Sequence, residues 1–265
     1  MIVVLIIAVT AALSIVMTAA WVVQRVTHNA GWVDTIWTFG TGAAGIAYAL
    51  APMPGVPWPG PRQLLVAVLV VAWSLRLGFH LAERTRRGPE DVRYAQFRIE
   101  WGAGFEVRMF RFLQIQAAAA AFLALSILAA ARNPGPLGLG DLAGLAVFMM
   151  ATAGETLADR QLGLFRRDPT HRGKICERGL WRWSRHPNYF FEWLGWLAYP
   201  LIAIDWSGND LWGWFALTGP AFMYVLLVHV SGIPPLEQQM LRSRGEAYRA
   251  YQARTRPFLP WPITS

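Results

Sequence analysis

The segment from Glu155 to Arg166 carries polar side chains whose spacing could hold a ligand. Glu155 and Asp159 are four residues apart, so a helix places both carboxylates on one face. Arg166 would then lie roughly 20° round the helix from Glu155, at about 100° per residue. The two acids repel each other, so an arginine or the hydroxyl groups of a ligand must compensate them. A solvated helix end, in which Arg160, Arg166 and Arg167 pair with the acids, explains the same pattern. The spacing leaves both interpretations open.

A basic connector at residues 160–185 follows these acids and contains seven arginines and one lysine, Lys174. A bias of positive charge towards the cytoplasm, or attraction to anionic lipid, would explain such a loop. The same cations could neutralise a polyanionic small molecule such as a dinucleotide pyrophosphate, because the planar arginine fork donates two hydrogen bonds to one phosphate. No G-x-G-x-x-G sequence follows a strand here, which excludes a Rossmann site.

The sequence RHPNY at 185–189, followed by Glu192, forms a second polar motif. Proline is favoured in the first turn of a helix, and Asn188 and Glu192 would then lie one turn apart. A side-chain amide and a carboxylate so arranged can grip a carboxamide, one accepting from its NH₂ group and the other donating to its oxygen. Nicotinamide presents that group. The alternative interpretation is a polar cap on a helix that holds no ligand.

Asp34 lies within an otherwise uncharged apolar stretch. A carboxylate buried there without a partner is strongly disfavoured, so Asp34 should be paired or should stay protonated. A neutral buried acid can polarise the carbonyl group of a substrate. A structural pair with Arg76 or His80 on a neighbouring helix is an equally good interpretation.

Composition indicates that membrane helices position these groups. Of the 265 residues, 55% are hydrophobic and only 15% are charged, which excludes the ordinary soluble class. The 14 tryptophans are typical of a lipid–water boundary. The one cysteine, Cys176, excludes an intramolecular disulfide, and the chain opens on an apolar run without a secretory signal. The apolar segments leave no room for a separate soluble domain, so residues 1–265 are expected to form one membrane-embedded domain.

The fold class predicted is all-α, a bundle of seven transmembrane helices, because a span needs about 20 mostly apolar residues. The expected spans are Met1–Val23, Gly31–Ala51, Leu64–Ala82, Phe110–Ala131, Leu139–Leu157, Asn188–Ile204 and Leu211–Val230. The shortest of these is the sixth.

The distribution of basic residues predicts how the bundle is oriented. Of the 24 lysines and arginines, 21 fall in the connectors after the odd-numbered spans and in the C-terminal tail, when Arg111 at the mouth of the fourth span is counted with the connector before it. The other side of the membrane has only Arg62 and Arg132, and Arg76 lies within a span. Because positive connectors face the cytoplasm, the N-terminus is expected outside and the C-terminus in the cytoplasm. This distribution also accounts for the net charge of +8 without a nucleic-acid partner.

Three stretches together resemble the membrane-embedded steroid 5α-reductase-like superfamily, in particular its bacterial branch, which is classed as a domain of unknown function. They are GLWRWSRHPNYFFEW at 179–193, ADRQLGLFR at 158–166 and SRGEAYRAYQARTRPFLPWP at 243–262. The resemblance covers nearly the whole chain. The RHPNY core is less specific, because sterol C14- and C7-type reductases share it. Isoprenylcysteine and phospholipid methyltransferases have a close RHPxY…E variant.

The resemblance implies NADPH-dependent reduction of a carbon–carbon double bond conjugated to a carbonyl, in a steroid-like or other lipid substrate. It implies that Asn188 and Glu192 hold the nicotinamide end, and that Asp159 and Arg166 hold the ribose and phosphate regions. It further implies a cofactor site that is completed by several other side chains. These are Lys174 at a phosphate, Arg185 in the RHPNY motif, Glu155 in place of the usual asparagine, and Glu246 and Tyr248 in the C-terminal helix that closes the site.

The resemblance also assigns the catalytic groups. The steroid enzymes pair a glutamate in the second span with a tyrosine in the third to hold the substrate carbonyl. Asp34 is the acid at that place, one methylene shorter, and the expected third span has no tyrosine. The nearest donor there is His80 or Arg76, so Asp34 and His80 are the predicted catalytic residues. No metal is expected.

Three functions remain open at this stage. The first is the NADPH-dependent reductase, a monomer in the bacterial cytoplasmic membrane that acts on a lipophilic small molecule among membrane lipids. The second is an S-adenosylmethionine-dependent methyltransferase of the isoprenylcysteine or phospholipid type, which would need fewer phosphate-binding arginines. The third is a non-catalytic membrane protein that binds lipid or assists assembly.

Overall fold

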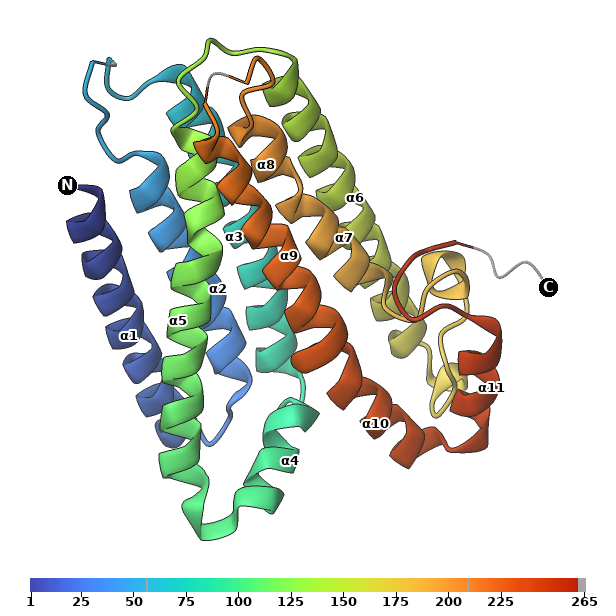
Figure 1. The fold of residues 1–265 in the computed structure, drawn as a ribbon. Helices are drawn as coiled ribbons and strands as arrows, with labels where there is room; N and C mark the ends of the chain where they lie inside the picture. Colours follow the sequence, from blue (N-terminus) through green and yellow to red (C-terminus); the bar gives the residue numbers. More distant parts are fainter. Residues whose placement is uncertain (56, 209, 262–265) are drawn as a thin grey trace. The chain divides into compact units, whose positions relative to one another are not determined.

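The structure, a computed structural model, describes residues 1–55, 57–208 and 210–261 (Figure 1). Pro262, which ends the C-terminal sequence motif, lies outside this range. The described chain is helical, and its β-type pairing is an isolated bridge between Ser184 and Arg256. The α-helices are α1 (Ile2–Thr27), α2 (Gly31–Ala49), α3 (Pro61–Arg87), α4 (Val92–Trp101), α5 (Phe105–Ala131), α6 (Leu139–Arg167), α7 (Pro187–Trp196), α8 (Ala198–Ala203), α9 (Thr218–Val225), α10 (Ile233–Arg244) and α11 (Glu246–Arg254). The all-α prediction is confirmed.

Short 3₁₀ and π turns join several of these helices. The 3₁₀ turns are Gly102–Gly104, Pro169–His171, Gly179–Arg182 and Trp212–Leu217, and a π turn covers Leu226–Val230. This π turn runs directly from α9 and precedes the break before α10. The expected span Leu211–Val230 is therefore a composite of 3₁₀, α and π segments.

Within the described residues, five helical segments are long and apolar enough to cross a membrane. They are Ile2–Thr27, Pro61–Arg87, Val92–Ala131, Leu139–Arg167 and Trp212–Arg244. Each is longer than the roughly 20 residues that a span requires. These helices are compatible with an integral, multi-pass membrane protein.

The two other expected spans are helical, but neither is among these five segments. Helix α2 has 19 residues and includes Asp34 and several threonines, which lower its apolar character. The expected span Asn188–Ile204 is divided between α7, with ten residues, and α8, with six. Neither piece alone reaches the length of a span.

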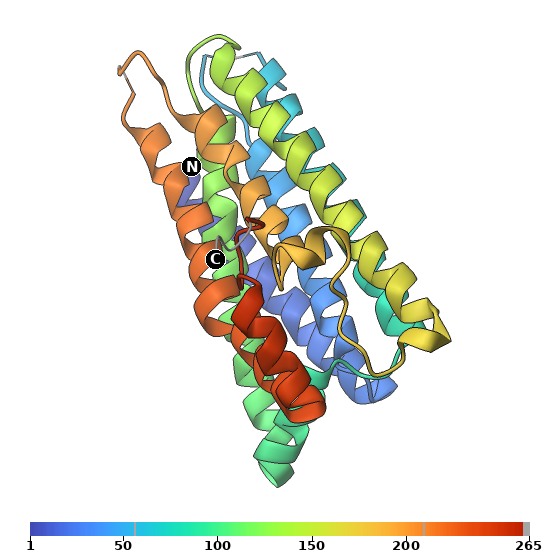
Figure 2. The same cartoon turned by 90° about the vertical axis from the view of Figure 1, so that its right-hand side faces the viewer.

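The chain divides into two compact units, which are described separately. One consists of Met1–Leu142 with Tyr199–Gly219, and the other of Ala143–Ala198 with Pro220–Ser265. In the first unit, α2 packs against α1, α3 and α5, and these helices lie side by side (Figures 1 and 2). Gly42 permits the close approach of α2 and α3, because a Cβ atom there would lie 2.2 Å from the Ser74 hydroxyl oxygen. Small residues allow this kind of packing between apolar helices.

Hydrogen bonds between side chains join α1 to α5. The Ser14 hydroxyl donates to Gln114 Oε1 at 2.6 Å, and Gln114 Nε2 donates to the Thr18 hydroxyl at 3.2 Å. Nearer the C-terminal end of α1, Gln24 Nε2 donates to Glu106 Oε2 at 3.0 Å. Because water does not compete for such groups inside a bilayer, these bonds fix which faces of the two helices meet.

A buried ion pair closes the end of the first unit where α3 and α6 begin. Arg62 donates to both carboxylate oxygens of Asp141 at 2.7 Å, and less than a tenth of either side chain is exposed. The same guanidinium donates to the backbone carbonyls of Asn133, Gly135 and Pro136, each at 2.7 Å. Arg62 therefore ties the turn between α5 and α6 to the start of α3.

We expect Asp141→Asn to lower the free energy of unfolding in detergent micelles by about 3–5 kcal/mol, because it leaves a buried guanidinium without its counter-charge. The matched control is Glu177→Gln, which breaks a bidentate pair with Arg254 that is largely exposed. That change should cost less than about 1 kcal/mol, since surface ion pairs contribute little. Equal losses in the two variants would show that the Arg62 pair does not hold the turn.

Candidate functional site

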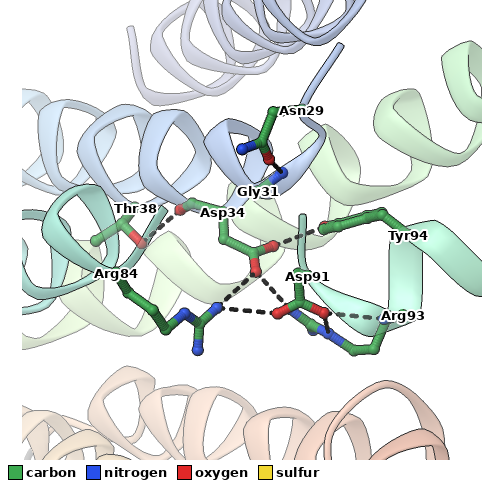
Figure 3. Close-up of polar contacts among 8 residues, drawn as sticks. All are labelled: Asn29, Gly31, Asp34, Thr38, Arg84, Asp91, Arg93 and Tyr94. Atoms are coloured by element: carbon green, nitrogen blue, oxygen red, sulfur yellow. Dashed lines mark hydrogen bonds and ion pairs between the residues drawn. The ribbon is translucent and has the colours of Figure 1, made fainter. Parts of the chain in front are cut away.

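Asp34, in the first turn of α2, lies at the centre of a polar cluster in the first unit (Figure 3). Its Oδ1 atom accepts a hydrogen bond from the Tyr94 hydroxyl at 2.6 Å. Its Oδ2 atom accepts a short hydrogen bond from Arg93 and lies 3.8 Å from Nη2 of Arg84. The Asp34 side chain is 18% exposed, so it is mostly shielded from water but retains some solvent access.

A second carboxylate, Asp91, completes the charge balance of this cluster. It accepts from Arg84 Nη2 at 3.0 Å and from Arg93 Nε at 2.9 Å, and it also caps α4 by accepting from the Arg93 backbone N–H. Burial favours a higher pKa for Asp91, but Arg93 and Arg84 outweigh it and hold the pKa below its ordinary value. Two carboxylates thus face two guanidinium groups, and their formal charges cancel.

Helix α4 reaches Asp34 because several contacts attach it to the start of α2. The Glu90 carboxylate, just before α4, accepts from the Ala30 backbone N–H at 2.9 Å and from Arg98 at 3.1 Å. Tyr94 is the buried residue of α4, with 2% of its surface exposed. The helix is therefore held by polar contacts at its N-terminal end, and it directs one phenol inwards.

The partners of Asp34 differ from those that the sequence suggested. Neither Arg76 nor His80 contacts the Asp34 carboxylate, which instead meets Tyr94, Arg93 and Arg84. With a phenol and an arginine both donating to it, Asp34 acts as an acceptor, and the group that can donate a proton is Tyr94. The expected role of Asp34 as a protonated donor is not what this geometry favours.

Tyr94 lies in the polar connector between the third and fourth expected spans, which contains none of the candidate residues predicted from the sequence. One sequence pattern predicts the helix that carries Tyr94. An aspartate N-cap at 91 precedes aromatic residues at 94, 97 and 101, which is helical spacing. Phe97 and Trp101 stack at 4.5 Å between ring centroids, as residues one turn apart on a helix can.

In the second unit, the structure brings together two of the predicted cofactor residues. Glu155, Asp159 and Arg166 lie on α6, as the spacing predicted. From α7, the Asn188 amide donates to Asp159 Oδ1 at 3.3 Å. Within the described residues, the Asn188 oxygen and its second N–H make no hydrogen bond. Those atoms can therefore still bind a ligand.

Glu192 lies one turn after Asn188 on α7, as predicted, and it is buried. The Trp196 indole N–H donates to Glu192 Oε1 at 3.0 Å, which orients the carboxylate. Glu155 is also buried, with 6% of its surface exposed. Acids buried among apolar helices are usually retained because they bind a partner or a ligand.

The remaining predicted residues lie in different surroundings. Arg166 and Lys174 are exposed, as phosphate contacts on a surface would be. Glu246 is exposed and pairs with Arg249, whereas Tyr248 is buried. Burial, followed by the charge of Glu237, raises the pKa of Tyr248. Arg185 is buried and directs its guanidinium to Glu237, so its counter-ion here is a residue of α10.

The described residues contain no cluster of three or more His, Cys, Asp or Glu side chains that could hold a metal ion. The polar side chains described above are carboxylates, guanidinium groups, an amide and a phenol. This set suits hydrogen bonding to a carbonyl, a carboxamide and phosphates.

Comparison with known proteins places the chain in a family. Residues 20–255 match the family described as "Protein of unknown function (DUF1295)", and the chain belongs to it. The chain is also similar to the uncharacterized protein C594.04c of Schizosaccharomyces pombe, with 27% identity over 269 residues. That alignment covers 91% of this chain and 75% of the yeast protein. No solved structure matches the chain.

Proposed function

We propose that this DUF1295 protein is a membrane-embedded reductase that uses NADPH to reduce a carbon–carbon double bond conjugated to a carbonyl. The observation that carries the proposal is the Tyr94 hydroxyl, held at 2.6 Å by Asp34 while Arg93 binds the other oxygen of the same carboxylate. The substrate is a lipophilic molecule, steroid-like or another lipid, because five helical segments of the described chain are apolar enough to cross a membrane. The protein acts as a monomer among membrane lipids.

Tyr94 suits the carbonyl end of this reaction. Addition of hydride to the β carbon of an enone places negative charge on the carbonyl oxygen, and an oriented donor stabilises that charge in a water-poor site. The Tyr94 hydroxyl has one proton, which Asp34 accepts in the structure, so the phenol serves as this donor once the substrate carbonyl takes the place of Asp34 as its acceptor. Before the substrate binds, Asp34 holds the phenol in position. A proton from water then completes the α carbon, so one hydride and one proton are added across the double bond. Asp34 is thus a positioning residue, and Tyr94 takes the donor role that the sequence gave to Asp34 or His80.

The residues of the second unit fit the chemistry of the cofactor. The free N–H and oxygen of Asn188 match the two ends of a carboxamide, and the buried Glu192 carboxylate one turn later can accept from its NH₂ group. Asp159 can accept from ribose hydroxyls, and the exposed Arg166 and Lys174 can bind phosphate. When bound, the nicotinamide supplies the hydride.

The proposal includes an orientation in the bacterial cytoplasmic membrane. It has seven spans, with α2 and the α7–α8 segment completing the five long apolar segments, the N-terminus outside and the C-terminus in the cytoplasm. Its support is the strong asymmetry of lysine and arginine about these segments. On this topology, the basic connector of residues 160–185 faces the cytoplasmic pool of NADPH.

Reporter domains fused after Arg62 and after Lys174 should report opposite sides of the membrane, the first outside and the second in the cytoplasm. The physical reason is that Arg62, at the start of α3, follows a connector without other basic residues, whereas Lys174 lies in the most basic connector. An alkaline phosphatase fusion and a fluorescent-protein fusion at each position provide complementary readouts. If both positions report the same side, the seven-span topology is wrong.

The purified protein should bind NADPH more tightly than NADH, and the affinity for NADPH should weaken as salt rises. The extra phosphate gains charge-assisted hydrogen bonds from exposed arginine and lysine, which salt screens. Titration followed by tryptophan fluorescence measures both dissociation constants, with S-adenosylmethionine as the comparison ligand. Equal affinities for NADPH and NADH would contradict the phosphate assignment. Binding of S-adenosylmethionine alone would favour the methyltransferase, and binding of none of the three would favour a non-catalytic protein.

Tyr94→Phe should lower kcat for the best enone roughly 10²–10³-fold, the usual effect of removing one oxyanion donor, without changing the affinity for NADPH. Asp34→Ala should lower kcat by a similar factor, because the phenol is no longer held in position before the substrate binds. Asp34→Asn retains an acceptor for the phenol and should therefore retain part of kcat. Stopped-flow oxidation of bound NADPH with a panel of cyclic and lipid enones measures these rates.

The control for this series is Tyr224→Phe, since within the described residues the Tyr224 hydroxyl makes no hydrogen bond. That variant should react at the wild-type rate. Tyr94→Phe that matched it would show that the Tyr94 hydroxyl is structural and that the carbonyl is held elsewhere.

A further inference from the structure

Glu237, on α10, collects hydrogen bonds from residues that lie far from it in the sequence. Its Oε1 atom accepts from Arg185 Nε at 2.6 Å and lies 3.2 Å from His186 Nε2. Its Oε2 atom accepts from Gln252 Nε2 on α11 at 2.8 Å. The side chains of Arg185, His186 and Glu237 are only 9%, 7% and 15% exposed. One carboxylate thus joins the RHPNY motif to both C-terminal helices.

The C-terminal segment adds further bonds to the same short stretch of chain. Arg185 donates from its guanidinium to the Thr255 carbonyl and from its backbone N–H to the Arg256 carbonyl, the latter at 2.8 Å. The Ser184 hydroxyl donates to the Phe258 carbonyl at 2.8 Å. The residues that directly precede α7 are therefore held from outside their own helix.

The charge of Glu237 sets the protonation of the His186 ring. A carboxylate oxygen that already accepts from Arg185 can only accept from the imidazole, so Nε2 of His186 carries the proton and Nδ1 is an acceptor. Burial, opposed by Glu237, lowers the pKa of His186. His186 is therefore a neutral ring with one defined tautomer.

We infer that Glu237 is a positioning residue for the cofactor site, which orients Arg185 and His186 and thereby fixes the first turn of α7. Asn188 lies two residues after His186 in that turn, and Glu192 lies one turn further on. Without Glu237, the Arg185 guanidinium would be a buried charge without its counter-ion, and it would draw the preceding chain towards water. The inference rests on the proposed function only where it assigns NADPH as the ligand that α7 receives.

Three measurements on the full-length protein in nanodiscs test this role, using Glu237→Gln as the variant. Glutamine keeps the volume and one acceptor but loses the charge. We expect the imidazole nitrogen signals of ¹⁵N-labelled histidine to show that His186 no longer has a fixed Nε2–H tautomer. Hydrogen exchange of the backbone amides at 187–196 should become faster. The dissociation constant for NADPH should rise about tenfold or more, since a hydrogen bond to a charged group contributes on that order.

Glu177→Gln is the matched control, because Glu177 also binds an arginine of the C-terminal helices but does so at the surface. It should leave all three measurements unchanged. Glu237→Asp retains the charge on a shorter arm and should keep the tautomer while binding NADPH with intermediate affinity. If Glu237→Gln does not fold, this second variant carries the test through affinity alone, and wild-type NADPH affinity in Glu237→Asp would then overturn the positioning role.

An unchanged tautomer, unchanged exchange at 187–196 and unchanged NADPH affinity in Glu237→Gln would overturn the positioning role. Failure of the wild-type protein to bind NADPH would overturn the proposed function instead. In that case, the tautomer and the exchange rates decide the role of Glu237, because neither depends on the cofactor. A changed tautomer with slow exchange at 187–196 would also contradict the inference, since α7 would then be fixed without Glu237.

Discussion

A charged side chain among apolar helices must find a counter-charge or hydrogen-bonding partner, and much of this structure follows from that constraint. Asp34 is satisfied by Tyr94, Arg93 and Arg84, and Arg62 is satisfied by Asp141 and three backbone carbonyls. In each case the partners come from elements that are distant in the sequence. These ion pairs consequently determine where the connecting segments are held against the helices. The apolar helix faces must pack in a way that allows these pairs to form.

The same constraint explains why the polar cluster at Asp34 can be chemically useful. Because Asp34 and Asp91 face Arg84 and Arg93, the cluster has no net formal charge, which lowers the cost of keeping the two carboxylates largely out of water. Tyr94 is the uncharged member of the cluster, and its hydroxyl can exchange Asp34 for a ligand as its hydrogen-bond acceptor. A neutral carbonyl group is a better replacement for Asp34 as its acceptor than a charged ligand would be, since a charge would unbalance the cluster.

Sequence periodicity predicted the features that depend on neighbours along one helix. The placement of Glu155, Asp159 and Arg166 on α6, and of Asn188 and Glu192 on α7, follows from helical spacing alone. The sequence did not predict the contacts of Asp34 with Tyr94 or of Arg185 with Glu237, because they join residues 60 and 52 positions apart. The division of α7 from α8 was missed because hydropathy registers an apolar run but not a break within it. Helix α4 could have been found from the Asp91 cap and the aromatic spacing that follows it.

The central claim is that the Tyr94 hydroxyl polarises the carbonyl of the substrate, and infrared difference spectroscopy of a bound enone tests it most directly. A ¹³C label on the carbonyl separates its stretching band from those of the protein. The account predicts a lower carbonyl frequency in the wild-type complex than in a non-polar solvent, and the loss of most of that shift in Tyr94→Phe. The same low frequency in both proteins would contradict it, because the donor would then be a group other than Tyr94.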